Sequence, residues 1–317
     1  MDRISIIGAG MMGPGIAQVF ATHGYPVGIY NRSLQKLDDV HGRVEANLAQ
    51  MAQYDLVEKS EIPQILGRIS TCTDLETVCR DSAVVIETIT ESLPLKQDLF
   101  AELDRLCPPT TILCSNTSVL SITEIGRKAL HPERVLGMHF YQPPYLVPLV
   151  EVIRTERTLP AYMDTIFNLL LAVGKAPVRV QKDVPGFIAN RMQHALWREA
   201  FALIDEGICD AATIDIAVRN SFGMRLPVLG PVANADLVGL DLTLAIHNYV
   251  LPHLCASGRP SSTLKAHVES NELGFKTKAG FLTWTEESIA AQRKKLTTHL
   301  LEMLSRNKAS GAAVDKV

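Results

Sequence analysis

Three features are missing from this sequence, and each absence excludes a class of protein. No stretch approaches the roughly 20 consecutive apolar residues that a membrane-spanning helix needs. The chain also has no large excess of charge of one sign. Its 31 Lys and Arg and 34 Asp and Glu leave a net charge of −3, which predicts neither nucleic acid nor an anionic membrane as a partner. The six cysteines form no CxxC motif and predict no disulfide framework.

We therefore expect a cytoplasmic protein, since the first predicted strand begins at residue 4 and leaves no room for a cleavable signal peptide. A metal site is not expected either. His247, His253 and Cys255 lie close together in the sequence, but their spacing fits no standard zinc pattern. We interpret these histidines as helix-surface residues.

The first half of the chain alternates short apolar segments with helical periodicity, which predicts parallel βαβ units. Long helices are predicted at 34–54 and 57–68. The predicted strands are 4–8, 26–30, 83–88, 111–115, 134–140, 148–153 and 176–181.

After "QKDVPGF" the strand patterns stop. The segment 186–206 has helical periodicity and is followed by Gly207, and a charged helix is predicted near 285–305. The fold class is therefore α/β, with a dinucleotide-binding domain of the Rossmann type at 1–184 and an all-helical domain at 185–317.

A glycine-rich loop follows the first predicted strand. Gly8, Gly10 and Gly13 form GxGxxG between a strand and a helix, and they flank Met11 and Met12. Such glycines permit a tight turn and a close approach to a pyrophosphate, which the helix N-terminus attracts. The loop predicts a bound NAD or NADP, with these residues at the cofactor.

The end of the second strand bears on the choice of cofactor. An NAD site usually has an acidic residue there for the ribose 2′-hydroxyl, but this chain has Asn31 and Arg32. An arginine with neutral hydrogen-bonding neighbours suits a 2′-phosphate. The motif leans toward NADP, unless Arg32 merely points to solvent.

Residues 134–140 and 148–153 are expected to pair as antiparallel strands about a bend centred on Tyr145. In that register His139 faces Glu151, so a carboxylate could orient an imidazole and stabilise its protonated form, as a general base needs. A buried His–Glu pair can also be purely structural.

Several segments together resemble the 3-hydroxyacyl-CoA dehydrogenase family over nearly the whole chain. They are "GAGMMGPGIAQV", "ETITESLPLKQDLF", "SNTSVLSI", "GMHFYQPPYLVPLVEVI", "KDVPGFIANRM" and "GPVANADLVGLD". The resemblance implies a Rossmann-type domain, a helical domain through which the protein dimerises, and hydride transfer between NAD(P) and an L-3-hydroxyacyl substrate.

The resemblance also implies roles for single residues. His139 would be the general acid–base and Glu151 its orienting partner, while Ser118 and Asn190 would contact the substrate oxygen. It implies that Glu91 and Lys96 lie near the nicotinamide ribose, and Asn116 is expected to bind the cofactor as well.

Three departures from the family pattern concern the substrate. The usual HFFNP is HFYQP here, with Gln142 in place of asparagine. The 48–60 segment, which helps to hold coenzyme A in thioester-using members, offers only Lys59 as a cation. The turn "FGMRLPVLGP" is lengthened and carries Arg225, as in the lambda-crystallin and L-gulonate 3-dehydrogenase branch.

The sequence thus predicts a homodimeric NAD(P)-linked dehydrogenase acting on a 3-hydroxyacyl-CoA or a small free 3-hydroxy acid. We expect Arg225 to bind a substrate carboxylate, although it could instead be structural. A non-enzymatic crystallin-like protein and a dinucleotide sensor are the alternatives, and the intact set of His139, Glu151, Ser118 and Asn190 favours the enzyme.

Overall fold

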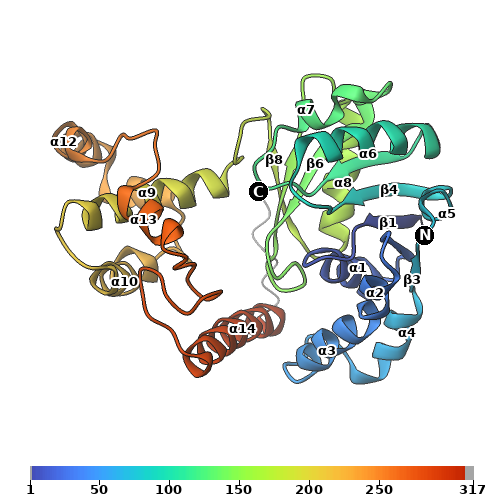
Figure 1. Ribbon diagram of the computed structural model, residues 1–317, viewed down its shortest axis with the longest axis horizontal. Helices are drawn as coiled ribbons and strands as arrows, with labels where there is room; N and C mark the ends of the chain where they lie inside the picture. Colours follow the sequence, from blue (N-terminus) through green and yellow to red (C-terminus); the bar gives the residue numbers. More distant parts are fainter. Residues whose placement is uncertain (1, 311–317) are drawn as a thin grey trace. The chain divides into compact units, whose positions relative to one another are not determined.

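The computed structural model describes residues 2–310 and divides into two compact units (Figure 1). Unit 1 is formed by the described residues up to Asn190 and from Leu296 onward, and unit 2 is Arg191–Lys295. The chain passes between the units inside two helices, α9 (Ala189–Asp205) and α14 (Glu286–Ala309).

Unit 1 is built on one eight-stranded sheet with the order β3-β2-β1-β4-β5-β6-β7-β8. Neighbouring strands are parallel except for β6 and β7, which are antiparallel. This topology confirms the predicted α/β class. The strands are β1 (Arg3–Ile7), β2 (Val27–Tyr30), β3 (Ile69–Cys72), β4 (Ser82–Glu87), β5 (Ile112–Ser115), β6 (Val135–Phe140), β7 (Leu149–Ile153) and β8 (Ala176–Val180).

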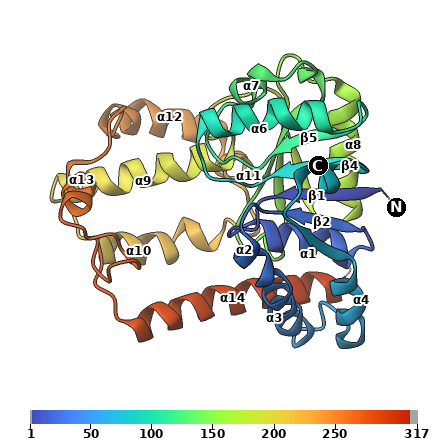
Figure 2. The same ribbon diagram turned by 45° about the vertical axis from the view of Figure 1, so that its right-hand side comes forward.

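Helices cover both faces of this sheet, as the alternation of side chains in β1 requires. Ile4 and Ile6 face one core and Ile7 faces the other. The first core is shared with α1 (Gly13–Thr22), α3 (Val40–Ala52), α4 (Ile62–Gly67) and α8 (Pro160–Ala172), and the second with α5 (Leu75–Cys79), α6 (Leu93–Leu106) and α7 (Ile122–Ile125). Figure 2 shows α1 and α6 on opposite sides of the strands.

All seven predicted strands are present, but β3 was missed and the first long helix was predicted wrongly. β3 is an edge strand whose central Ser70 and Thr71 are exposed, so it lacks the apolar pattern of its neighbours. The predicted helix at 34–54 is two helices, α2 (Leu34–Asp38) and α3, which meet at Asp39. The segment 57–68 forms a short 3-10 helix, η1 (Lys59–Glu61), followed by α4.

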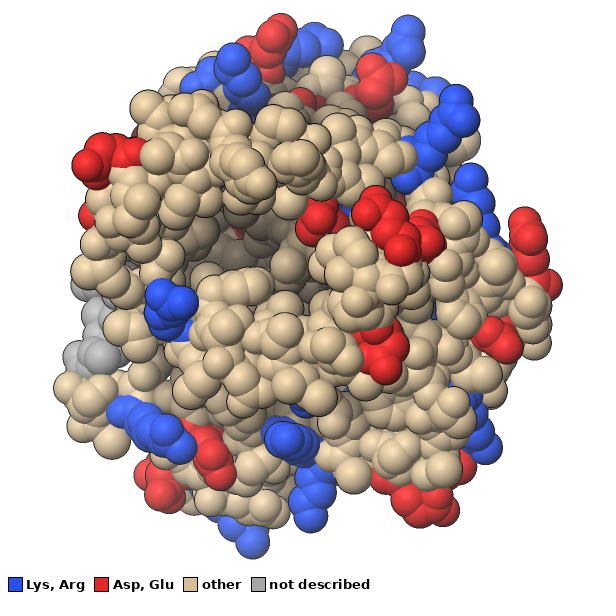
Figure 3. Space-filling view, turned by 90° about the vertical axis from the view of Figure 1, so that its left-hand side faces the viewer, with Lys and Arg blue, Asp and Glu red and all other residues tan. Residues whose placement is uncertain are grey.

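Unit 2 is helical apart from isolated bridges at Gly274–Ala279 and Ala279–Thr283. Besides its share of α9 and α14 it contains α10 (Ala211–Arg219), η4 (Phe222–Met224), α11 (Pro231–Val238), α12 (Leu240–Val250), η5 (Leu251–His253) and α13 (Ser262–Glu269). On the face drawn in Figure 3, basic and acidic side chains are scattered among neutral ones without a continuous patch of one sign. No helix among the described residues is long and apolar enough to span a membrane.

Candidate functional site

The glycine loop between β1 and α1 has the geometry of a phosphate-binding turn. Gly8 has a φ of +124°, a conformation that other residues rarely adopt. A Cβ at Gly13 would lie 2.0 Å from the carbonyl oxygen of Gly8, so only glycine lets the helix start so close to the strand. A Cβ at Gly10 would meet nothing within 4 Å, which leaves that side of the loop open to a ligand.

The start of α1 can hold an anion, since no side chain caps it. Met12 is the N-cap residue, and it makes no side-chain hydrogen bond to the first turn. The first amides of a helix then point outward and attract a pyrophosphate. The residues of this turn therefore fit a dinucleotide.

Arg43 of α3 supports the loop and was missed by sequence reasoning. Its guanidinium donates to the carbonyl oxygens of Ala9, at 3.5 Å, and Met11, at 3.3 Å. It lies 30 residues beyond the motif, inside a predicted helix, and no sequence pattern marks it.

The residues after β2 are arranged as a short turn. Asn31 accepts a hydrogen bond on its side-chain oxygen from the backbone N–H of Ser33, at 2.9 Å. Arg32 is exposed and forms no ion pair with any residue between 2 and 310. Its guanidinium is therefore available to a ligand of opposite charge.

The predicted register of β6 and β7 is confirmed, because His139 pairs directly with Glu151. Both side chains are buried, and His139 Nδ1 lies 2.8 Å from Glu151 Oε2. The two strands approach closely at Gly137, where a Cβ would lie 2.8 Å from the Cδ1 atom of Ile153. The carboxylate fixes Nδ1 of the imidazole and leaves Nε2 for a substrate.

Glu151 accepts hydrogen bonds on both carboxylate oxygens. Its Oε1 accepts from the backbone N–H groups of Ile188, at 2.8 Å, and Ala189, at 3.0 Å, where α9 begins. Its Oε2 accepts from Tyr141 Oη, at 3.0 Å, in addition to His139. Burial raises the pKa of this carboxyl, but these donors together hold the pKa below its usual value, so Glu151 is a carboxylate at neutral pH.

Ser118, Asn190 and Asn116 lie in unit 1 and are linked to the pair or to each other. Asn190 donates from its side-chain amide to the backbone oxygen of Ser118, at 3.0 Å. Asn116 accepts on its side-chain oxygen from the N–H of Phe140, at 2.8 Å, and thereby holds the residue next to His139.

Glu91 and Lys96 belong to a network centred on the buried Glu87, which was not predicted from the sequence. Lys96 Nζ lies 2.6 Å from Glu87 Oε1 and 3.3 Å from Glu91 Oε2. Glu91 Oε1 in turn accepts hydrogen bonds from Thr117 Oγ1 and from the N–H of Ser118, at 3.3 Å. The network fixes the loop that carries Ser118. The roles at the nicotinamide ribose that the sequence predicted for Glu91 and Lys96 stay predictions.

The segment after His139 packs on the cofactor helix. A Cβ at Gly15 of α1 would lie 2.6 Å from Cγ of Pro144, so a residue larger than glycine would displace this segment. The glycine loop is also tied to β4, since Thr88 Oγ1 donates to the carbonyl oxygen of Gly8 at 3.0 Å. The acid–base pair and the phosphate loop thus share one edge of the sheet, at the carboxyl ends of its parallel strands.

Comparison with known families agrees with this geometry. Residues 3–184 match the NAD-binding domain of 3-hydroxyacyl-CoA dehydrogenase, and residues 186–284 match the C-terminal domain of the same enzymes. The chain belongs to the 3-hydroxyacyl-CoA dehydrogenase family. It is accordingly an oxidoreductase with an NAD-binding domain, which confirms the enzyme interpretation of the sequence.

Two kinds of relative are similar to this chain. A 3-hydroxybutyryl-CoA dehydrogenase of Clostridioides difficile is 36% identical over 90% of this chain and all of its own length. A 5-formyl-3-hydroxy-2-methylpyridine 4-carboxylate 5-dehydrogenase of Mesorhizobium japonicum is 31% identical over 91% of this chain and 93% of its own.

A solved structure of such a pyridine-carboxylate dehydrogenase, described as an NAD⁺-dependent dismutase, superimposes with a TM-score of 0.89 at 29% identity. It covers 98% of this chain and 99% of its own.

Arg225 lies in unit 2, directly after η4, and its side chain is exposed. Its carbonyl oxygen accepts from the N–H groups of Val228 and Leu229, which closes the lengthened turn. The guanidinium makes no ion pair within the described chain. Its role toward the substrate stays a prediction.

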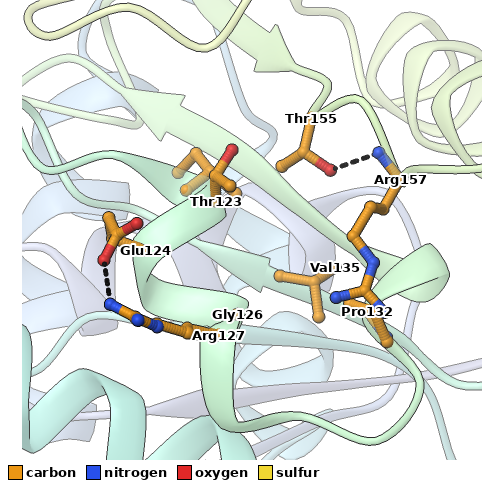
Figure 4. A pocket seen from close by; sticks show the side chains of 9 residues that line it. Thr123, Glu124, Gly126, Arg127, Pro132, Val135, Thr155 and Arg157 are labelled. Atoms are coloured by element: carbon orange, nitrogen blue, oxygen red, sulfur yellow. Dashed lines mark hydrogen bonds and ion pairs between the residues drawn. The ribbon is translucent and has the colours of Figure 1, made fainter.

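A separate cavity of about 330 Å³ lies at the opposite end of β6 and holds none of the predicted site residues (Figure 4). Val135 lines it together with Thr123, Glu124, Arg127, Thr155 and Arg157. Arg127 pairs with Glu124 at 3.4 Å, so acid and base offset each other on its wall. Across residues 2–310, no group of three or more His, Cys, Asp or Glu side chains is placed to hold a metal ion.

Proposed function

We propose that His139 is the general acid–base of this oxidoreductase and that Glu151 orients it. Oxidation of a secondary alcohol requires loss of the hydroxyl proton, and Nε2 of a neutral imidazole can accept that proton. The carboxylate at 2.8 Å stabilises the positive charge that then develops on the ring. In the reverse direction the protonated ring returns the proton to the carbonyl oxygen.

Ser118 and Asn190 are the groups we propose to contact the substrate oxygen. The two residues are linked by the hydrogen bond from Asn190 Nδ2 to the backbone carbonyl oxygen of Ser118. An amide NH₂ group has a second N–H, which can donate to the oxygen as its charge changes. Asn190 also lies in the first turn of α9, where the helix dipole favours negative charge.

One observation carries this proposal: the buried His139–Glu151 pair, with every hydrogen bond to Glu151 coming from a donor that stabilises its charge. A purely structural pair would not require Nε2 to be left for a further partner. When it is bound in the glycine loop, the nicotinamide cofactor accepts the hydride. The residues proposed to hold it are Gly8, Gly10, Met11, Met12, Gly13, Asn31, Arg32, Glu91, Lys96 and Asn116, with Arg43 added from the structure.

For the substrate we propose a small free hydroxy acid in preference to a coenzyme A thioester. The 48–60 segment offers only Lys59 for the phosphates of coenzyme A, whereas Arg225 provides a guanidinium suited to a carboxylate. The pyridine-carboxylate dehydrogenase with a TM-score of 0.89 is named for a free acid, which supports this choice.

A substrate screen tests the proposal. We expect reduced nicotinamide to form with at least one free 3-hydroxy acid, at a higher kcat/KM than with the matching coenzyme A thioester. The measurement is the absorbance of the reduced cofactor across paired acids and thioesters, with NAD and NADP in parallel. Turnover of thioesters alone would leave the oxidoreductase assignment intact and reject the free acid.

For the cofactor we propose that Arg32 allows NADP to bind in addition to NAD. The Arg32→Ala variant should then bind NADPH much more weakly while its affinity for NADH changes little, because a charge-assisted contact to the 2′-phosphate is lost only from NADPH. Fluorescence titration of both reduced cofactors measures this. Lys36→Ala, on the neighbouring α2, is the control for general surface charge. Equal effects of Arg32→Ala on the affinities for both cofactors would show that Arg32 points to solvent and does not bind the 2′-phosphate.

We further propose that the protein is a homodimer and that the helical part of the chain, 185–317, forms the contact. Of residues 191–295, all of which are described, only Ile289 is buried. Val228, Val232 and Tyr249 are 84%, 76% and 76% exposed. Isolated monomers rarely expose apolar surface on this scale, and a second copy of unit 2 would cover it. The six free cysteines are consistent with the cytoplasmic location that we propose.

Measuring the mass in solution tests the dimer. We expect light scattering to give twice the 34.8 kDa of one chain. Tyr249→Asp should lower the mass or the unfolding temperature, since it places a charge in the covered surface. Asn248→Asp introduces the same charge at a neighbouring polar position of α12 and is the matched control. An unmutated protein with the mass of one chain would reject the proposal.

A further inference from the structure

The Tyr141 hydroxyl shares an oxygen with the proposed base. Glu151 Oε2 accepts both from His139 Nδ1, at 2.8 Å, and from Tyr141 Oη, at 3.0 Å. Tyr141 follows His139 by two residues, so its side chain leaves the strand on the same face. The imidazole and phenol rings lie 4.5 Å apart between centroids and are tilted by 53°.

The hydroxyl can be removed without removing the ring. A phenylalanine at position 141 would keep the ring and lose only the oxygen. Burial raises the pKa of Tyr141, and the charge of Glu151 raises it further. The phenol therefore keeps its proton over the pH range in which the enzyme works, and it donates a hydrogen bond to Glu151 throughout that range.

No other titratable side chain competes for this carboxylate within the described residues. From α9 it receives only the backbone N–H groups of Ile188 and Ala189. From β8 it pairs with Val178, which is apolar. The ring of Phe187 lies 5.7 Å from the His139 ring and carries no charge. His139 and Tyr141 are thus the two titratable groups that face Glu151.

We propose that Tyr141 is a positioning residue that sets the pH range in which His139 works as a base. A donor on Oε2 withdraws negative charge from the oxygen that stabilises the protonated imidazole. His139 then releases its proton more readily than it would beside a carboxylate with one donor fewer. The enzyme consequently oxidises its substrate at a lower pH than the same site with phenylalanine at 141. This inference rests on the proposed acid–base role of His139.

The pH profile of kcat/KM tests the proposal in the full-length enzyme. In alcohol oxidation the base must be neutral, so activity falls on the acid side as His139 takes up a proton. Without the hydroxyl, Glu151 holds that proton more tightly. We expect Tyr141→Phe to move the acid limb upward by about 0.5 to 1 pH unit, the size of one hydrogen bond's contribution.

The pH profile of the reverse reaction, ketone reduction, gives a second measurement of the protonation of His139. Ketone reduction requires a protonated His139, so the alkaline limb of its profile should move upward by the same amount. A loss of packing alone would lower kcat in both directions without moving either limb. The plateau value of kcat in Tyr141→Phe should stay within a few-fold of the unmutated enzyme, because no group that contacts the substrate is removed.

Tyr145→Phe is the matched control. It removes a phenol hydroxyl from the same segment between β6 and β7, and among residues 2–310 that hydroxyl has no hydrogen-bond partner. We expect its two limbs to coincide with those of the unmutated enzyme.

An unmoved or lowered acid limb in Tyr141→Phe would overturn the inference, and so would an equal shift in Tyr145→Phe. The acid–base role itself is tested separately by His139→Gln. Full turnover in that variant rejects the role of His139, whereas an inactive His139→Gln with an unmoved limb in Tyr141→Phe rejects only the role of Tyr141.

Discussion

His139→Gln is expected to lower kcat by about 10²- to 10⁴-fold, because glutamine cannot take up the substrate proton. Cofactor affinity should be nearly unchanged, since the glycine loop and the start of α1 are formed by other residues. Steady-state kinetics on the substrate from the screen and titration of NADH fluorescence separate the two quantities.

His23→Gln is the matched control for this variant. His23 is an exposed histidine of the same unit, and among the described residues its Nδ1 is hydrogen-bonded only to the carbonyl oxygen of Val19 in α1. It should keep full activity. If His139→Gln turned over substrate at a near-normal rate, the assignment of the base would be wrong.

Glu151→Gln should lower kcat as well, and it should also destabilise the protein. Glutamine would turn its NH₂ group toward at least one of the present donors and leave a buried polar group unsatisfied, at a cost of about 1–3 kcal/mol in the free energy of unfolding. Denaturant unfolding distinguishes this from His139→Gln, which we expect to fold with near-normal stability.

The second large effect is expected at Arg225. If its guanidinium pairs with a substrate carboxylate, Arg225→Ala should reduce kcat/KM for the free acid by roughly 10- to 150-fold, the equivalent of about 1.5–3 kcal/mol for a charge-assisted pair. A thioester has no such carboxylate and should be much less affected. Matched kinetics on a 3-hydroxy acid and its coenzyme A ester provide the measurement.

Arg219→Ala controls for the loss of any arginine from unit 2. Arg219 is an exposed residue of α10 whose Nε donates to the carbonyl oxygen of Asp215, and it should tolerate the change. Preference of the unmutated enzyme for the thioester, or an equal loss on both substrates in Arg225→Ala, would leave Arg225 with a structural role.

The sequence predicted those parts of the site that depend on local patterns. The glycine loop has a fixed spacing, and the hairpin register followed from the centre of the bend at Tyr145, so His139 and Glu151 could be paired before any coordinates. Strand alternation places Tyr141 on the same face as His139, but its bond to Glu151 could not be predicted, because Tyr141 lies just beyond the end of β6.

The burial of polar residues could not be predicted from the sequence either. Lys96 was predicted only as a residue near the nicotinamide ribose, and nothing in the sequence showed that it is 1% exposed and paired with Glu87 at the end of β4. The start of α9 was predicted three residues too early, since Gly186 and Phe187 adopt positive φ values of 76° and 48°. Such values depend on what surrounds the backbone, here the approach of Ile188 and Ala189 to Glu151.

The hydrogen bonds from Ile188 and Ala189 to Glu151 limit where the chain can be cut into separate domains. Two of the four hydrogen bonds to Glu151 come from residues beyond 184, and the chain enters unit 2 inside α9, after Asn190. A fragment that stops at 184 would keep a buried carboxylate with half of its donors. A chimera that exchanges helical domains between relatives should therefore retain residues 185–190 from the parent that supplies the sheet, so that the carboxylate and its backbone donors keep one common origin.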